Sequence, residues 1–420
     1  MMPDLATGAP IAGRRVRAAA RAHASRLAFT SFTSRASRLS LTAFTSRASR
    51  RSLTAFTSRA SHAFATLALA TSLLLTACAS DGTPTDPDPP APDAGALWNV
   101  VDSLTQTLVA ANPSYSRLTV SVYDSQHARV YERSYGGFSP AANIAVASAS
   151  KLVAGTLLLD LVARGELTLD RTTGDVLGWS GERGTITLRH LLSFTSGLAP
   201  EAGCTINPLT TLAACVRDIE ATATVAPPGT RYDYGSTHLH VAARMAEVVT
   251  GQSWNALYRE RLADPLGIEA SSRFFALPNA ALGTANPLVA GGLRISAHDY
   301  ARLLGVIFAR GSAFGLTTAT PALFDLQARE PYPSVTVGNS PGAPFGFRYG
   351  LTAWLHCSTP ATGCTELSSP GAFGFTPWID RQTGYYATIA MEEVAGSGAT
   401  FGITLLQRIE PAIRAALAAR

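Results

Sequence analysis

The sequence is almost without lysine. Lys151 is the one lysine among 34 basic residues, so arginine fills every other cationic position. Arginine cannot be deprotonated in a protein, whereas a buried lysine can be. Lys151 stands in the apolar stretch "NIAVASASKLVAG", residues 143–155, three positions after Ser148. Because positions i and i+3 share a helix face, we expect the amine beside the hydroxyl, where it can act as a general base.

Cysteine is also scarce, with five in the chain and no C-x-x-C pair. A metal site is therefore not expected, and no motif calls for a cofactor. Four of the cysteines, Cys204, Cys215, Cys357 and Cys364, allow three pairings. Their spacing favours Cys204–Cys215 and Cys357–Cys364, and an exported protein is expected to hold such pairs as disulfides.

Most of the chain has no net positive charge, although the formal net charge of the whole sequence is +5. Eleven arginines and one acidic residue precede position 81, which leaves 28 acidic against 23 basic residues in the remainder. Nucleic-acid binding requires a basic surface. We therefore expect no nucleic-acid partner.

An uncharged apolar run of fifteen residues lies at 63–77. It is too short for a comfortable membrane span but suits the central region of a signal peptide. The run ends in Leu75-Thr76-Ala77-Cys78, which resembles the bacterial lipobox, whose cysteine is lipidated and becomes the new N-terminus. We expect a lipid anchor at Cys78 in the cell envelope. The alternative is a plain secretory signal.

A repeat of period twelve precedes this run, with "FTSRASRLSLTA" from Phe32, "FTSRASRRSLTA" from Phe44 and "FTSRAS" from Phe56. It is interpreted either as a basic leader or, as we favour, as sequence upstream of a true start near Leu53. Residues 1–77 are therefore set apart from the fold. Residues 78–95, rich in Pro and Asp, predict a disordered tether.

The folded part begins near residue 96. Leucines and valine recur at helical spacing over residues 97–108 and predict a helix. Alternating residues at 118–123 and again at 128–134 predict a β-hairpin. The stretch 148–165 is apolar nearly all round, which predicts a buried helix with Ser148 at its N-terminus. Free amides at that end favour a negatively charged oxygen.

The remainder predicts helices followed by strands. Residues 156–285 are mostly helical or loop in pattern, and a terminal helix is expected from Phe401. Strands are expected at residues 348–357, 374–380 and 384–394. This order predicts an α+β fold, an antiparallel sheet flanked by helices with a mostly helical insertion at 156–285. The sheet part is expected at about 96–155 and 286–420, within one domain over 96–420.

Several motifs, in order, resemble those of β-lactamase-related serine hydrolases, the superfamily of class C β-lactamases, D-alanyl-D-alanine carboxypeptidases and family VIII esterases. Ser148-Ala149-Ser150-Lys151 resembles the S-x-x-K nucleophile motif. Further segments are similar to the class C branch: Ile186–Leu198, Tyr234-Gly235-Ser236, Ala263–Ile268 and Ala290–Leu304. The resemblance covers nearly all of residues 96–420 and implies a β-lactamase/transpeptidase-like fold.

The resemblance also implies a mechanism. Ser148 would form an acyl-enzyme, Lys151 would activate it, and Tyr234 would pass a proton to the leaving group and then help to activate water. From the residues alone, tyrosine suits this role because its hydroxyl can both donate and accept a hydrogen bond. The backbone amides of Ser148 and Ala372 would form the oxyanion hole.

Two positions depart from the family pattern. Ser236 stands where the family has Asn, so any substrate hydrogen bond has a shorter reach. Ser369-Pro370-Gly371 replaces Lys-Thr-Gly or His-x-Gly. Gly371 is expected to let substrate approach, but Ser369 brings no positive charge to a substrate carboxylate. Arg294 is the candidate that could replace this charge.

Together these observations predict a monomeric, lipid-anchored serine hydrolase facing the periplasm or exterior, with a small-molecule ester or amide substrate. One alternative is a D-amino-acid peptidase or weak β-lactamase. Another is a penicillin-binding sensor that acylates without turnover, although an intact Ser148, Lys151 and Tyr234 favour an enzyme. The chain also contains scattered histidines that we expect to be structural: His190, His238, His240, His298 and His356.

Overall fold

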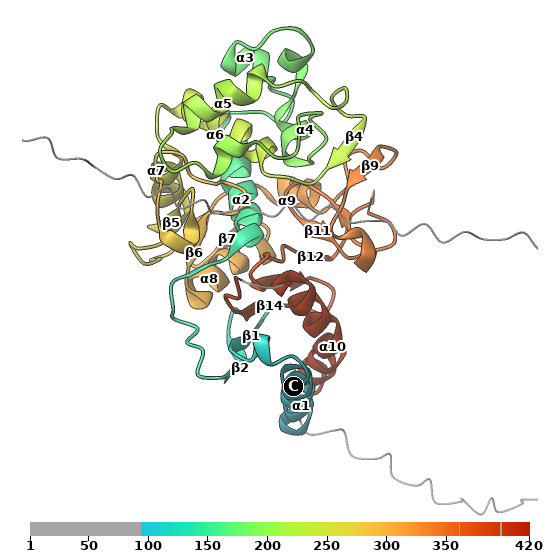
Figure 1. Cartoon of the computed structure of the whole chain (residues 1–420). Helices are drawn as coiled ribbons and strands as arrows, with labels where there is room; N and C mark the ends of the chain where they lie inside the picture. The colour runs from blue at the N-terminus through green and yellow to red at the C-terminus, as the bar shows by residue number, and fades with distance from the viewer. Residues whose placement is uncertain (1–93, 361, 395–396) are drawn as a thin grey trace, which may run out of the picture. The chain divides into compact units, whose positions relative to one another are not determined.

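The computed structural model describes residues 94–360, 362–394 and 397–420 (Figure 1). The expected leader, Cys78 and the tether up to residue 93 lie outside this part. Its helices are α1 (Ala94–Ala111), α2 (Ser150–Ala163), α3 (Thr173–Leu177), α4 (Leu188–Leu192), α5 (Leu212–Ala221), α6 (Thr237–Thr250), α7 (Trp254–Tyr258), α8 (Ala297–Phe308), α9 (Pro321–Gln327) and α10 (Gly398–Ala418). Among these residues, none of the helices has both the length and the apolar composition needed to cross a membrane.

Half of the described strands form one antiparallel sheet of seven, in the order β10-β11-β12-β13-β14-β1-β2. The strands of the described part are β1 (Leu118–Asp124), β2 (Arg129–Tyr135), β3 (Ile144–Ala145), β4 (Arg231–Asp233), β5 (Arg273–Phe274), β6 (Leu293–Ile295), β7 (Ser312–Ala313), β8 (Leu316–Thr317), β9 (Thr336–Asn339), β10 (Arg348–Tyr349), β11 (Trp354–Leu355), β12 (Glu366–Ser368), β13 (Thr376–Asp380) and β14 (Tyr385–Ala390). β1 and β2 form the predicted hairpin, and β1 pairs with β14. The predicted α+β class is confirmed.

The large sheet is covered by helices on both faces. Side chains on its strands alternate with a period of two, so one face carries Val120, Val122 and Ile389 toward α1 and α10. The other face carries Tyr123 and Tyr386 into the cluster that includes α2 and α8. Figure 1 shows α1 and α10 side by side at the bottom, and α3 to α6 gathered at the top. The mainly helical middle of the chain thus lies at the end of the unit away from α1. The expected limits of the insertion stay a prediction.

The prediction of a single strand at residues 348–357 is wrong. The chain instead forms β10 and β11, which pair with each other. A tight turn joins them, in which the Gly350 amide donates to the Ala353 carbonyl at 2.9 Å and Thr352 has a φ of 65°. This turn packs against α2, where a Cβ on Gly155 would lie 1.8 Å from Thr352 Oγ1. A long-range contact therefore imposes a turn that the apolar pattern did not predict.

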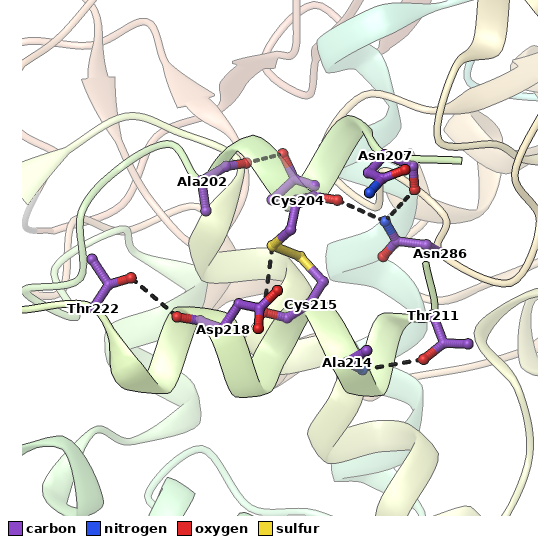
Figure 2. Close-up of a disulfide and its surroundings, with 10 residues drawn as sticks. Ala202, Cys204, Asn207, Thr211, Ala214, Cys215, Asp218, Thr222 and Asn286 are labelled. Carbon is purple, nitrogen blue, oxygen red and sulfur yellow. Dashed lines mark hydrogen bonds between the residues drawn. A yellow bond between two sulfur atoms is a disulfide. The ribbon is translucent and has the colours of Figure 1, made fainter. Parts of the chain in front are cut away.

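Both disulfides join the predicted partners. Cys204–Cys215 has Cα atoms 5.3 Å apart, and Cys357–Cys364 spans 5.7 Å in the loop between β11 and β12. Figure 2 shows that the first disulfide lies beside a side-chain clamp. There Asn286 Nδ2 donates to the carbonyls of Cys204, at 2.8 Å, and Asn207, at 2.9 Å. The loop after Cys204 is thus tied both to α5 and to the segment before β6.

Candidate active site

Ser148 lies in a short 3-10 turn, Ala147–Ala149, that leads directly into α2. The preceding residue, Ala147, has a φ of 46°, in the left-handed region that residues other than glycine rarely adopt. Such strain persists only where the surroundings over-determine the backbone, and it is concentrated at functional sites. The turn therefore presents Ser148 from a backbone that is held in one conformation.

Three hydroxyl groups from separate elements hold this turn. They donate to three successive carbonyls: Ser150 to Ala147 at 2.6 Å, Ser369 to Ser148 at 2.9 Å, and Tyr300 of α8 to Ala149 at 2.8 Å. The three donors come from α2, from the segment after β12 and from α8. Their convergence fixes the nucleophile relative to both the sheet and the helices.

Lys151 lies beside Ser148, as predicted from the i, i+3 spacing. Its side chain is 3% exposed on a helix whose first twelve residues are all buried. The amino group donates to Ser148 Oγ at 3.1 Å and to the Ala290 carbonyl at 2.8 Å. It also lies 4.6 Å from the centroid of the Tyr234 ring. No ion pair joins it to a carboxylate in the described part of the chain. An amine in such surroundings is suited to exchange a proton with the hydroxyl.

Tyr234 completes this group from another element. It follows β4, which pairs in parallel with β9. The Tyr234 amide donates to the Asn339 carbonyl at 2.8 Å, and Asn339 Nδ2 donates back to the Tyr234 carbonyl at 2.9 Å. Its ring stacks on Trp354 at 5.1 Å and meets Phe194 edge-on at 5.4 Å. The sequence offered no signal for Trp354 beyond an aromatic residue in an expected strand.

The expected oxyanion-hole amides are available. Among the described residues, neither the Ser148 nor the Ala372 amide donates to a backbone carbonyl. Ser236 directly precedes α6, and its own amide donates to Glu201 Oε1 at 3.1 Å. The Ser236 hydroxyl makes no capping bond to that helix, and the residue lines a cavity with Ser148. Ser236 therefore remains placed to contact a substrate.

Ser369 and Gly371 make contacts within the chain that the sequence did not predict. Ser369 is buried, and its hydroxyl is used on the Ser148 carbonyl, so it supports the nucleophile instead of facing a substrate. At Gly371 a Cβ would lie 2.2 Å from the Val146 carbonyl oxygen. The glycine is thus needed for a close approach between two segments of the chain. Sequence comparison places both residues near the site but does not show which way they face.

Arg294 does not supply the missing positive charge. Its guanidinium donates to the carbonyls of Pro278, at 2.9 Å, and Asn143, at 2.6 Å. It also lies 3.6 Å from Glu392 Oε1. These contacts hold the residue against neighbouring loops, and it does not line either cavity at Ser148.

Three histidines, His238, His240 and His356, are enclosed in the fold. Burial lowers the pKa of His238 and of His240 to about 4 and that of His356 to about 3, so these rings are neutral near pH 7. His238 is held by Ser196 Oγ at 2.7 Å and by the Asp233 carbonyl at 2.8 Å. No hydrogen bond links a described histidine to Ser148. A Ser/His/Asp arrangement around this serine is not formed.

The chain contains one G-x-S-x-G pattern, at residues 338–342 around Ser340. A nucleophile elbow of that type needs a strand followed directly by a helix. Here β9 is followed by a three-residue 3-10 turn, Ala343–Phe345. The pattern is therefore part of a surface turn near the site and not a second nucleophile.

Two cavities meet at Ser148. The aromatic cavity, about 200 Å³, is lined by Tyr234, Phe345, Phe347 and Trp354 with smaller residues. The aliphatic cavity, about 450 Å³, is lined by residues that include Ile206, Leu277, Pro278, Leu288 and Phe373. Ser148 and Ala372 line both, and among the described residues Lys151 is the only charged side chain lining either one. The two cavities thus adjoin at Ser148 and Ala372.

Comparison with known proteins identifies the class. Residues 101–405 match the Beta-lactamase family, and because this is well over half of the sequence, the chain belongs to that family. Members of the family with this fold are serine hydrolases. The predicted β-lactamase/transpeptidase-like fold and the predicted family are therefore both confirmed.

Single relatives share limited sequence identity with this chain. The chain is 38% identical over 143 residues to penicillin-binding protein 4 of Amycolatopsis lactamdurans, a match that spans 32% of this chain and 36% of that protein. The structure of a "putative beta-lactamase" from Bacteroides dorei DSM 17855 is similar, with a TM-score of 0.67 and 28% identity over 75% of this chain and 98% of that one. EstCE1, "a hydrolase with promiscuous acyltransferase activity", has a TM-score of 0.61 and 17% identity over 76% and 99% of the two chains, which shows the shared fold alone.

Proposed function

We propose that the protein is a serine hydrolase that cleaves neutral carboxylic esters through an acyl-enzyme on Ser148. The observation that carries this proposal is the absence of fixed positive charge around the nucleophile. Lys151 is the one charged residue lining the two cavities, and its amine is occupied by Ser148 and Ala290. The site therefore favours a carbonyl compound without a carboxylate beside the scissile bond.

In the proposed reaction, Lys151 takes the proton of Ser148 as Oγ attacks the ester carbonyl. The amides of Ser148 and Ala372 hold the oxygen that becomes negative. When the carbon–oxygen bond breaks, Tyr234 passes a proton to the departing alcohol. Water then attacks the acyl-enzyme, with Tyr234 and Lys151 acting in the reverse sense. The contact of Tyr234 with Lys151 and its place in the same cavity as Ser148 support this role.

Penicillins and peptidoglycan stem peptides differ from simple esters in carrying a carboxylate. A charge-assisted hydrogen bond to that group contributes about 1.5–3 kcal/mol, or roughly one to two powers of ten in affinity. Ser369 is neutral and turned toward the Ser148 carbonyl, and Arg294 is bonded to two other carbonyls. Neither residue provides this contribution.

A substrate panel tests the proposal. We expect kcat/KM for short-chain p-nitrophenyl esters to exceed that for a chromogenic cephalosporin or a D-alanyl peptide by at least about tenfold. The Ser148→Ala variant should lose the ester activity and so report any background hydrolysis. Efficient cephalosporin or D-peptide turnover with negligible esterase activity would instead favour the β-lactamase or peptidase alternative.

We further propose that the mature protein is anchored to the cell envelope by lipid on Cys78. The lipobox-like Leu75-Thr76-Ala77-Cys78 and the Pro/Asp-rich segment that follows support this proposal. Mass spectrometry of the membrane fraction should find Cys78 as an acylated N-terminus, and Cys78→Ser should release the protein from that fraction. A mature form that begins at another residue would contradict the anchor.

A further inference from the structure

We propose that the two cavities divide the substrate, with the acyl group in the aliphatic cavity and the leaving alcohol in the aromatic cavity. The favoured substrates are then aryl esters of medium-length aliphatic acids. This inference rests on the proposed function, because it assumes an acyl-enzyme on Ser148. It adds an orientation and a substrate class to that function.

The position of the proton donor sets the orientation. The alcohol oxygen needs a proton when its bond to the carbonyl carbon breaks, so it must depart on the side of Tyr234. Tyr234 lines the aromatic cavity and is absent from the lining of the aliphatic cavity, which contains Lys151 and Ser236 instead. The acyl chain needs no proton, so it binds in the aliphatic cavity.

The bonds and protons of the reaction balance when the two groups are placed in this way. Ser148 Oγ gains a bond to the acyl carbon, the bond to the alcohol oxygen breaks, and the alcohol leaves with the proton from Tyr234. Departure of the alcohol vacates the aromatic cavity, so water can enter beside Tyr234. The acyl group stays in place on the other side until water releases it as the carboxylic acid.

The linings match these two groups in shape. In the aromatic cavity the Trp354 ring stacks on Tyr234, and Phe345 lies near Phe347 with ring centroids 5.8 Å apart, which leaves about 200 Å³ for a flat ring. The aliphatic cavity offers about 450 Å³ between Ile206, Leu277 and Leu288. Buried apolar surface stabilises a bound chain in proportion to its length, so longer acyl groups gain until the cavity is full.

The mouth of the aliphatic cavity is apolar and is held in place. Ile206, which lines the cavity, is 53% exposed at the end of the 3-10 turn Gly203–Ile206, and this turn carries the disulfide to Cys215. Figure 2 shows the Asn286 clamp on the carbonyls of Cys204 and Asn207, on either side of Ile206. A wall fixed at three points can define an acyl pocket in a way that a free loop cannot.

The experiment uses two series of esters on the full chain. With p-nitrophenol as the alcohol, kcat/KM should rise about fourfold for each methylene from acetyl to hexanoyl. Ile206→Asp should flatten this slope, whereas Phe345→Ala should keep it. With butyrate as the acid, Phe345→Ala should reduce the preference for aryl over methyl alcohols by about tenfold, measured as acid release. Val248→Asp, at an exposed apolar position on α6 outside both cavities, is the matched control.

Pre-steady-state kinetics sharpen the test, because the acyl-enzyme has already lost its alcohol. Ile206→Asp should weaken the dependence of the deacylation rate on acyl length, whereas Phe345→Ala should keep that dependence. If Ile206→Asp does not fold, Ile206→Thr carries the same comparison with nearly the same shape. The division would be overturned if the dependence of kcat/KM on acyl length changed in Phe345→Ala and not in Ile206→Asp, or changed in neither variant. The proposed ester hydrolysis would not be affected by that result. A wild-type protein that hydrolyses no ester would overturn the proposed function and the division with it.

Discussion

Two cationic side chains, Lys151 and Arg414, have opposite surroundings. Lys151 is 3% exposed, and its described partners are a hydroxyl, a carbonyl and an aromatic ring, all uncharged. Arg414, on α10, has a side chain that is 40% exposed and contacts three carboxylates. It lies 3.0 Å from Asp380 Oδ2 and 3.2 Å from Glu410 Oε1, and it pairs with Glu366.

The difference shows why a chain built on arginine keeps a lysine at one position. A guanidinium is permanently charged and offers several donors, which suits it to bridge carboxylates. A lysine amine, unlike a guanidinium, can exchange a proton with a neighbouring hydroxyl. Each cation therefore matches its neighbours: the permanently charged guanidinium meets carboxylates, and the amine meets a hydroxyl.

Exchanging the cation at the nucleophile should have the largest effect. We expect Lys151→Arg to lower ester hydrolysis and fluorophosphonate labelling by about three powers of ten or more, because a guanidinium cannot accept the serine proton. Arg414→Lys should leave ester hydrolysis within about twofold. Circular dichroism would check that both variants fold. Full activity in Lys151→Arg would break the comparison.

Removing the other cation should affect stability and not chemistry. We expect Arg414→Gln to lower the free energy of unfolding by about 2 kcal/mol at pH 8, because Asp380 is fully buried and loses its partner. The loss should shrink near pH 5, where Glu410, whose pKa burial raises to about 7, takes up a proton. Urea denaturation at the two pH values measures this, with Arg408→Gln, at an exposed position on the same helix, as the control. Equal losses in both variants would show that the cluster does not depend on Arg414.

The smallest effect concerns Glu410. Burial, with Glu366 adding to it, raises the Glu410 pKa to about 7, although Arg414 acts in the opposite direction. Because the folded-state pKa lies above the unfolded one, ionisation of Glu410 costs stability as the pH rises from about 4.5 to 7. Glu410→Gln should therefore raise the free energy of unfolding by about 1 kcal/mol at pH 8 and leave it unchanged near pH 4. A loss of stability at pH 8 would mean that the pair with Arg414 outweighs the cost of burial.

Much of the candidate site was predictable because it depends on short spacings. A spacing of three positions along one helical turn places Lys151 beside Ser148. The alternation of apolar and polar residues with a period of two specifies the hairpin of β1 and β2. The disulfide partners lie 11 and 7 positions apart, so chain proximity favours those pairs. In each case the information lies within a few turns of the chain, where the backbone itself limits the geometry.

The tertiary structure decided the contacts between distant segments. Ser369 lies 221 positions from Ser148 and could equally have faced a substrate, but packing turns its hydroxyl onto the Ser148 carbonyl. Arg294 is bonded to carbonyls of other loops, and the turn between β10 and β11 fits against Gly155. The two cavities form where residues distant in sequence meet: the start of α2 and the 276–291 loops line the aliphatic cavity, and residues 341–354 and the start of α10 line the aromatic cavity. Residue types and local spacing determined that Lys151 lies beside Ser148, because the two residues are three positions apart on one helical turn. The direction of each supporting side chain depends on which distant surface it packs against, and no local pattern carries that information.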